Sequence, residues 1–172
     1  MARFFTYCWQ HDEMLRYRDG APVVFAYGSQ FARRGVCPGD EIYIVSVHHG
    51  RVYLLSKMLV WVVTHSPVDF ARYAQMEPAA ATEYLVAEAY TPARLVPLPV
   101  ELARTLRFVR GNQLIGLTFR SEDMVDRQGL RSVRQLSPPS AASLDQLLPR
   151  LVRYHPGKTE QRPADRQPRR SS

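Results

Sequence analysis

The chain of 172 residues contains little cysteine and no long apolar run. Its two cysteines, Cys8 and Cys37, form no Cys-x-x-Cys motif, so we expect free thiols in a reducing compartment. No stretch of 18 or more apolar residues occurs, so we expect no membrane-spanning helix. The apolar core that follows the basic start of a secretory signal is missing after Arg3. These absences together predict a cytoplasmic protein with no membrane partner.

The common sequence motifs of enzymes are missing as well. There is no Gly-x-Gly-x-x-Gly, phosphate loop, His-Glu-x-x-His or Gly-x-Ser-x-Gly. His48 and His49 are adjacent, and adjacent residues of a strand point to opposite faces, which disfavours a shared metal. We interpret the two histidines as a turn pair. Glu122, Asp123 and Asp126 lie in a segment typical of a polar loop. We therefore predict no enzyme, no metal and no cofactor.

Basic residues outnumber acidic ones, but the excess is concentrated near the C-terminus. The chain has 23 Lys and Arg against 16 Asp and Glu, a net charge of +7. Residues 150–172 hold seven of the basic and two of the acidic groups, which leaves 16 against 14 for the rest. We predict that 154–172 is a disordered basic tail after a domain formed by 1–153. Such a tail is either a solvated end or a weak, salt-sensitive contact for a polyanion.

Apolar and aromatic runs predict a mixed α+β fold. Residues 2–9 alternate like a strand, and residues 41–47 and 51–64 predict a β-hairpin that bends at Gly50. Residues 28–35 predict a brief helix that Ser29 caps and Gly35 ends. Further expected elements are strands near 84–90 and 113–119, and helices near 66–76, 100–108 and 140–151.

The strand expected near 51–64 is unusually long and is apolar on both faces. Simple alternation places Val52, Leu54, Met58, Val60 and Val62 on one face, and Tyr53, Leu55, Lys57, Leu59, Trp61 and Val63 on the other. A strand of about 13 residues exceeds the usual five or six and must twist and coil. We expect it to belong to a bent β-barrel, with the interior on one side and short helices on the other.

Aromatic and basic residues near this hairpin form the candidate site. Aromatic rings stack on nucleobases, and nearby polar groups can contact base edges. Recognition of a flipped base needs a pocket of this kind. The expected base-pocket residues are Trp9, Ser29, Gln30, Phe31, Tyr53 and Trp61, and the expected phosphate-binding residues are Arg33, Arg34 and Lys57. The alternative is that Trp9, Tyr53 and Trp61 are core residues and that Lys57 extends to a sheet edge.

Several segments in this order resemble the PUA-like superfamily, in particular its EVE and YTH-like branch. They are "FFTYCW", the "PGD" turn, "EIYIVSV", "VYLLSKMLV" and "GLRSVRQLSPPSAASLDQLL". The resemblance implies a small, strongly bent β-barrel with peripheral helices. It also implies nucleic-acid binding, in several branches through a pocket for a modified base flanked here by Trp9 and Gly28–Phe31. Related chains tend to have Asn where Ser29 stands, and a serine cannot make the two-point contact of an amide.

These observations predict a nucleic-acid-binding module that holds a modified or flipped base, with DNA and RNA both open. Because domains of this type occur beside nuclease or helicase modules, a partner protein that supplies enzymatic activity is also expected. The alternative is a structural or protein-interaction domain without catalytic activity. A third reading, a small enzyme acting on a nucleotide or RNA, would need a paired His or carboxylate such as His65 near Glu83 or Asp69.

Overall fold

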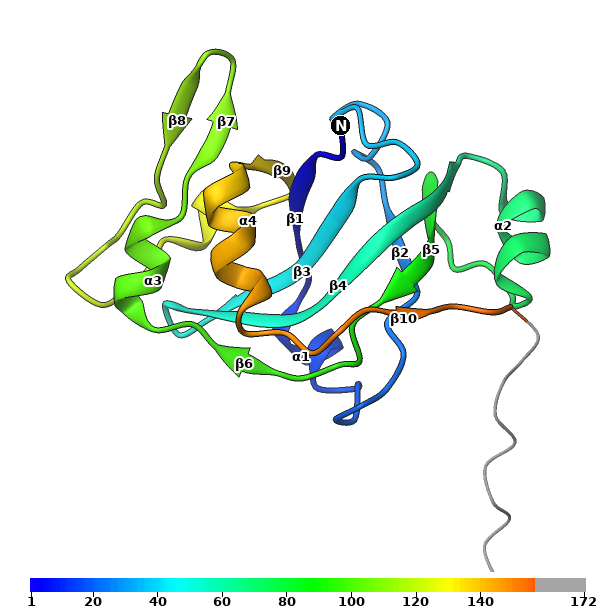
Figure 1. Cartoon of the computed structure of the whole chain (residues 1–172), viewed down its shortest axis with the longest axis horizontal. Coiled ribbons are helices and arrows are strands. Elements are labelled where there is room, and N and C mark those ends of the chain that lie inside the picture. Colours follow the sequence, from blue (N-terminus) through cyan, green and yellow to red (C-terminus); the bar gives the residue numbers. More distant parts are fainter. Residues whose placement is uncertain (157–172) are drawn as a thin grey trace, which may run out of the picture.

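A ten-stranded sheet organises the protein in the computed structural model, which describes residues 1–156 (Figure 1). The strands are β1 (Phe4–Cys8), β2 (Phe25–Gly28), β3 (Glu41–His48), β4 (Arg51–Thr64), β5 (Glu83–Tyr90), β6 (Val96–Pro97), β7 (Phe108–Arg110), β8 (Gln113–Ile115), β9 (Val133–Leu136) and β10 (Val152–Arg153). The helices are α1 (His11–Met14), α2 (Pro67–Ala74), α3 (Val100–Thr105), α4 (Pro138–Asp145) and the 3₁₀ turn η1 (Arg127–Leu130). The predicted α+β class is thus confirmed.

The sheet is open rather than closed into the expected barrel. Its strands follow the order β10-β5-β4-β3-β1-β9-β7-β8, with β2 paired to β5 and β6 paired to β4. The path ends at two short strands, β10 and β8, which do not pair with each other. The β7–β8 hairpin projects from one end of the molecule, and α2 lies at the other end (Figure 1). Barrel closure is therefore a wrong prediction, although the sheet is bent by bulges.

The central hairpin matches the predicted one. His49 and Gly50 connect β3 to β4 with φ angles of 48° and 72°. Two consecutive positive φ angles define the tight turn whose twist suits a two-residue hairpin. The parallel partner of β3 is β1, and β9 pairs with the other edge of β1 in antiparallel fashion. This arrangement places β1, and with it Trp9, near the middle of the sheet.

A bulge at Leu55 makes the predicted faces of β4 wrong. Ile44 pairs with Ser56 and Val45 pairs with Leu54, so Leu55 has no partner on β3. One inserted residue reverses the alternation that follows it. Lys57 consequently shares a face with Leu54 rather than with Tyr53. Further register shifts occur between Leu59 and Val62, where β4 pairs with β5.

Two main cores lie on the two faces of this sheet. One contains Phe5, Met14, Ala26, Ile42, Ile44, Leu55, Met58 and Leu85. The other contains Tyr43, Val45, Leu54, Leu98, Ala103, Phe108, Leu136 and Leu144, and it is covered by α3 and α4. A smaller cluster of Phe70, Ala74, Tyr84 and Val86 holds α2. Among the described residues no helix is long and apolar enough to cross a membrane.

Several predicted boundaries differ from the observed ones. The 66–76 helix is confirmed as α2, whose Ser66 side chain accepts from the Asp69 N–H at 3.1 Å. Residues 31–35 form a turn instead of a helix. The predicted basic tail is only partly described, since 157–172 lie outside the described residues. Tyr154 belongs to the folded part, because its O–H donates to the Ala74 carbonyl at 3.2 Å.

The "PGD" turn is organised by a buried carboxylate. Asp40 is 2 % exposed and accepts from the backbone N–H groups of Arg3 and Cys37, both at 3.0 Å. The Arg3 guanidinium donates to the same carboxylate at 2.8 Å. Burial raises the pKa of Asp40, but these hydrogen bonds outweigh it and hold the pKa below its ordinary value.

We expect Asp40→Asn to destabilise the protein by about 1–3 kcal/mol at pH 7, because two backbone N–H groups and the Arg3 guanidinium lose a charged acceptor. The folded-state pKa of Asp40 is depressed, so its stabilisation is present above the unfolded-chain value of about 3.9. That stabilisation is lost as the pH falls through the folded-state pKa. Urea unfolding of both proteins between pH 7 and pH 2.5 should show the difference shrinking towards acid. A difference that does not change with pH would contradict this role.

Candidate functional site

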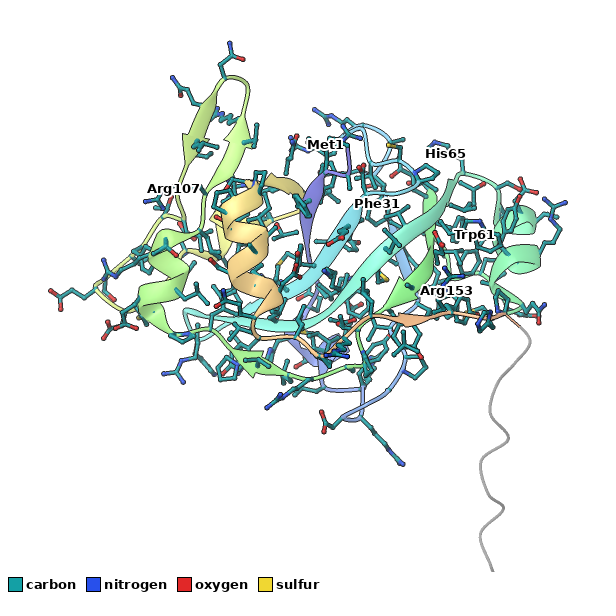
Figure 2. The ribbon with its side chains drawn as sticks, viewed as in Figure 1. Met1, Phe31, Trp61, His65, Arg107 and Arg153 are labelled. Carbon is teal, nitrogen blue, oxygen red and sulfur yellow. The ribbon has the colours of Figure 1, made fainter. Side chains whose placement is uncertain are left out.

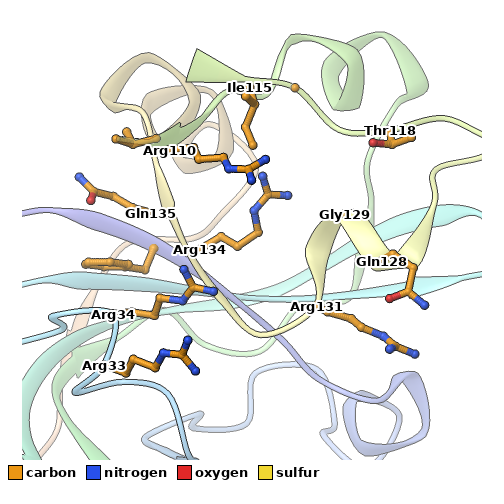
Figure 3. Close-up of a pocket in the computed structure, with 13 residues that line it drawn as sticks. Arg33, Arg34, Arg110, Ile115, Thr118, Gln128, Gly129, Arg131, Arg134 and Gln135 are labelled. Carbon is orange, nitrogen blue, oxygen red and sulfur yellow. The ribbon is translucent and has the colours of Figure 1, made fainter. Parts of the chain in front are cut away.

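Five arginines line a cavity with a volume of about 690 Å³ (Figure 3). We call it the arginine cavity, and its arginines are Arg33, Arg34, Arg110, Arg131 and Arg134. They come from the 31–35 turn, from β7, from the residue after η1 and from β9. The other lining residues are uncharged: Phe5, Val109, Ile115, Gly116, Thr118, Gln128, Gly129 and Gln135. The cavity therefore collects positive charge without an acidic neighbour in its wall.

The positive charges of this cavity are not neutralised within the described chain. In residues 1–156 none of the five guanidinium groups forms an ion pair. Arg134 packs over the ring of Phe108, with its guanidinium carbon 4.1 Å from the ring centroid. Burial, together with the neighbouring charges of Arg34 and Arg110, lowers the pKa of Arg134. Mutual repulsion in a recess favours the binding of an anion.

The turn that carries Arg33 and Arg34 is held by hydrogen bonds to a buried carboxylate. The buried Glu83 carboxylate on β5 accepts from the backbone N–H groups of Phe31 and Ala32. This carboxylate, rather than the predicted Ser29 cap, organises the turn. Gly28 allows the backbone to pass close to Tyr7 and Phe31, since a Cβ there would lie 3.0 Å from the Tyr7 hydroxyl and 3.2 Å from the Phe31 ring. The two arginines consequently project from a fixed backbone.

A second cavity of about 330 Å³ adjoins the first through Arg131, which lines both. We call it the middle cavity; it is lined by Tyr7, Cys8, Gly28, Ser29, Gln30, Phe31, Arg131, Ser132 and Val133. The Gln30 side-chain oxygen is buried and has no hydrogen-bond partner among the described residues. Ser132 has a φ angle of 68°, a left-handed conformation that non-glycine residues seldom adopt. Burial raises the pKa of Cys8, so its thiol is not an activated nucleophile.

A third recess, of about 250 Å³, is mainly aromatic and adjoins the middle cavity through Tyr7. We call it the aromatic pocket; it is lined by Tyr7, Trp9, Glu13, Arg16, Tyr17, Phe25 and Tyr27. The Trp9 and Tyr17 rings lie 5.5 Å apart between centroids and are tilted by 39°. The Tyr7 hydroxyl donates to the Tyr27 carbonyl, and burial raises the pKa of Tyr7 to about 12. Tyr7 is therefore a neutral, fixed wall between the two cavities.

Six of the nine predicted site residues lie along this row of cavities. Trp9 lines the aromatic pocket, and Ser29, Gln30 and Phe31 line the middle cavity. Phe31 is fully buried and packs edge-on against Tyr7, so it supports the wall and offers no free ring face. The remaining two of these six, Arg33 and Arg34, line the arginine cavity.

The other three predicted residues lie elsewhere. Trp61 is 39 % exposed and packs against Tyr73 of α2, at the α2 end of the molecule (Figure 2). Tyr53 packs against His11, with the ring centroids 4.7 Å apart. The Lys57 ammonium lies 2.9 Å from Glu41 and 2.7 Å from Asp145, and the side chain is 9 % exposed. None of the three lines any of the three cavities, and Lys57 is occupied by two carboxylates.

The sequence did not predict most of the residues that line the three cavities. Arg110, Arg131 and Arg134 are absent from the predicted set, as are Tyr7 and Tyr17 of the aromatic pocket. The only available signal was local: Arg131 and Arg134 stand three residues apart in "LRSVRQ". Nothing in the sequence shows that this segment lies beside the 31–35 turn.

Three histidines gather near the β3–β4 turn. The His11 and His48 rings stack at 4.2 Å, and His49 contacts His48 at 4.0 Å because it occupies the turn rather than a strand. The interpretation of His48 and His49 as a turn pair is therefore confirmed, and their rings are in contact. Burial and the neighbouring His48 lower the pKa of His11. In residues 1–156 no group of three His, Cys, Asp or Glu side chains is arranged to hold a metal ion.

Comparisons of this chain with protein-family models, with curated proteins and with solved structures find no match. The geometry and charge of the three cavities are consequently the basis for a function.

Proposed function

We propose that the protein binds a nucleic-acid strand, with phosphate in the arginine cavity and one base in the aromatic pocket. The observation that carries this proposal is that the three cavities are neighbours: Arg131 lines the first two, and Tyr7 lines the middle cavity and the aromatic pocket. A strand needs cationic groups for its backbone and aromatic faces for its bases, and both lie here along one path. The proposal gives the chain a binding role and no catalytic one.

The aromatic pocket suits stacking on one face of Trp9. Trp9 and Tyr17 already contact each other at 5.5 Å, so a base cannot enter between them without displacing a ring. The volume of about 250 Å³ lies below the roughly 300–1,000 Å³ of sites for drug-sized ligands. A single planar ring system therefore fits better than a whole nucleotide.

Polar recognition would come from the middle cavity. The exposed Ser29 hydroxyl can donate to a base edge or accept from it. The Gln30 oxygen is unpartnered but buried, so it would accept from a base only after its side chain turns toward the cavity. We include in the proposal that 1–153 is a PUA-like domain of the EVE type. The positions of Trp9 and Gly28–Phe31 beside these cavities support that assignment, whereas the open sheet is a departure from it.

We expect Trp9→Ala to weaken binding of single-stranded oligonucleotides by about 1–3 kcal/mol, or about 5- to 150-fold, because a stacking face is lost. Fluorescence anisotropy with labelled DNA and RNA of several base compositions measures this loss. Trp9→Phe, which keeps an aromatic face, should retain most of the affinity.

Trp61→Ala is the matched control, since it removes the other indole from a site outside the three cavities. Thermal unfolding of each variant separates folding from binding. Equal losses for Trp9→Ala and Trp61→Ala, or a folded Trp9→Ala protein with unchanged affinity, would contradict the proposed base pocket.

A further inference from the structure

The arginine cavity carries more positive charge than the internal phosphates of a bound strand would neutralise. Five guanidinium groups line it, with no carboxylate among the lining residues. An internal phosphodiester brings one negative charge, so one or two of them leave most of the cavity unneutralised. A terminal phosphate monoester brings about −1.5 to −2, and each further linked phosphate adds to that.

The arrangement of the arginines also favours a compact anion. In Figure 3 the side chains of Arg34, Arg110 and Arg134 extend towards a common region, although they come from three different segments. The effect of Arg34 and Arg110 on the pKa of Arg134 agrees with this proximity. An extended backbone is better served by arginines spaced along a groove. Convergent guanidinium forks suit the several oxygens of one phosphate group or of linked phosphates.

The arginine cavity offers no surface on which a base could stack. Phe5, its one aromatic lining residue, is fully buried. The nearby Phe108 is also buried, and the Arg134 guanidinium covers its ring. Additional polar groups come from Thr118 and Gln128, whose side chains are uncharged. The cavity is thus built for phosphate oxygens and differs in kind from the aromatic pocket.

We propose that the arginine cavity binds a group of two or more linked phosphates, as carried by the 5′ end of a triphosphorylated nucleic-acid strand. This inference rests on the proposed function, because the middle cavity and the aromatic pocket would receive the nucleotides that follow. The same chemistry occurs in free tripolyphosphate and in nucleoside triphosphates. The middle cavity adjoins the arginine cavity at Arg131, and this neighbourhood favours a strand end as the source.

The test uses the full chain and one 3′-labelled oligoribonucleotide sequence prepared with a 5′-hydroxyl, a 5′-monophosphate or a 5′-triphosphate. At 150 mM salt we expect the triphosphate form to bind at least tenfold more tightly than the hydroxyl form, with the monophosphate between them. Arg110→Ala should remove most of that preference, because Arg110 lines the arginine cavity. The variant should still fold, since Arg110 is exposed on the β7–β8 hairpin. Arg51→Ala removes an equal charge outside the cavity and should keep the preference. Trp9→Ala should weaken all three forms by a similar factor.

Unlabelled tripolyphosphate and a nucleoside triphosphate serve as competitors in the same assay. Competition that abolishes the preference for the triphosphate form supports the anion site. Equal affinity of the three oligonucleotides, or an equal loss for all three in Arg110→Ala, would overturn the inference while leaving nucleic-acid binding intact. Binding of tripolyphosphate by a protein that binds none of the oligonucleotides would overturn the strand-end proposal and the proposed function together.

Discussion

Lys57→Ala is expected to lower the free energy of unfolding by about 1.5–3 kcal/mol, the range for a hydrogen bond to a charged group, because the ammonium is buried while Asp145 is exposed to water. The Lys57 ammonium lies between Glu41 on β3 and Asp145 at the end of α4, at 2.9 and 2.7 Å. The Tyr43 hydroxyl also donates to Asp145 at 2.9 Å, and burial raises the pKa of that tyrosine. Without the ammonium, two carboxylates would face each other beside a core. Urea unfolding at pH 7 measures the loss.

The matched variants separate charge from packing. Lys57→Met keeps the apolar stem and removes the charge, so it should be almost as destabilising as Lys57→Ala. Combining it with Glu41→Gln and Asp145→Asn removes the unpaired carboxylates and should recover much of the lost stability. Lys57→Ala should leave oligonucleotide affinity unchanged as long as the protein remains folded. A loss of less than about 1 kcal/mol in the free energy of unfolding would contradict this structural role. A folded variant with weakened oligonucleotide binding would instead support Lys57 as a phosphate-binding residue.

The misplacement of Lys57 shows where strand reasoning stops. The sequence predicted the hairpin and the length of β4 well, because β-branched runs and a two-residue turn are local features. The bulge at Leu55 is not local, since it depends on which β3 residue each β4 residue faces. In a strand that is apolar on both faces, the inserted residue leaves no break in the pattern. A prediction by simple alternation therefore assigns the residues just after the bulge, including Lys57, to the wrong face.

Only part of the candidate site could be predicted from the sequence, for a related reason. Arg33 and Arg34 stand in one turn and could be found by inspection, and Trp9 ends a recognisable strand. Arg110 and Arg134 reach the same cavity only through pairing of β9 with β1 and of β7 with β9. The segment of β9 was not predicted as a strand, because its middle residues Arg134 and Gln135 are polar and face the cavity. The net charge does not predict the arginine cavity either, since it does not show where in the fold the arginines lie.

Arg34→Ala combined with Arg110→Ala is expected to weaken oligonucleotide binding and also to make it less sensitive to salt. Each lost charged hydrogen bond costs about 1.5–3 kcal/mol. For single strands the slope of log K against log salt falls by about 0.7 for each phosphate contact, so the double variant should flatten it by about 1.4. Anisotropy titrations between 50 and 400 mM salt measure both effects on the full chain.

Arg51→Ala combined with Arg72→Ala is the matched control, because it removes the same charge from positions that line none of the cavities. The basic residues beyond 156 are present in both double variants, so any difference between the two belongs to the arginine cavity. We expect the control to keep the affinity within about twofold and the slope nearly unchanged. Equal flattening in both double variants would mean that net charge alone attracts the polyanion. In that event the convergence of five arginines on one cavity would be irrelevant to binding.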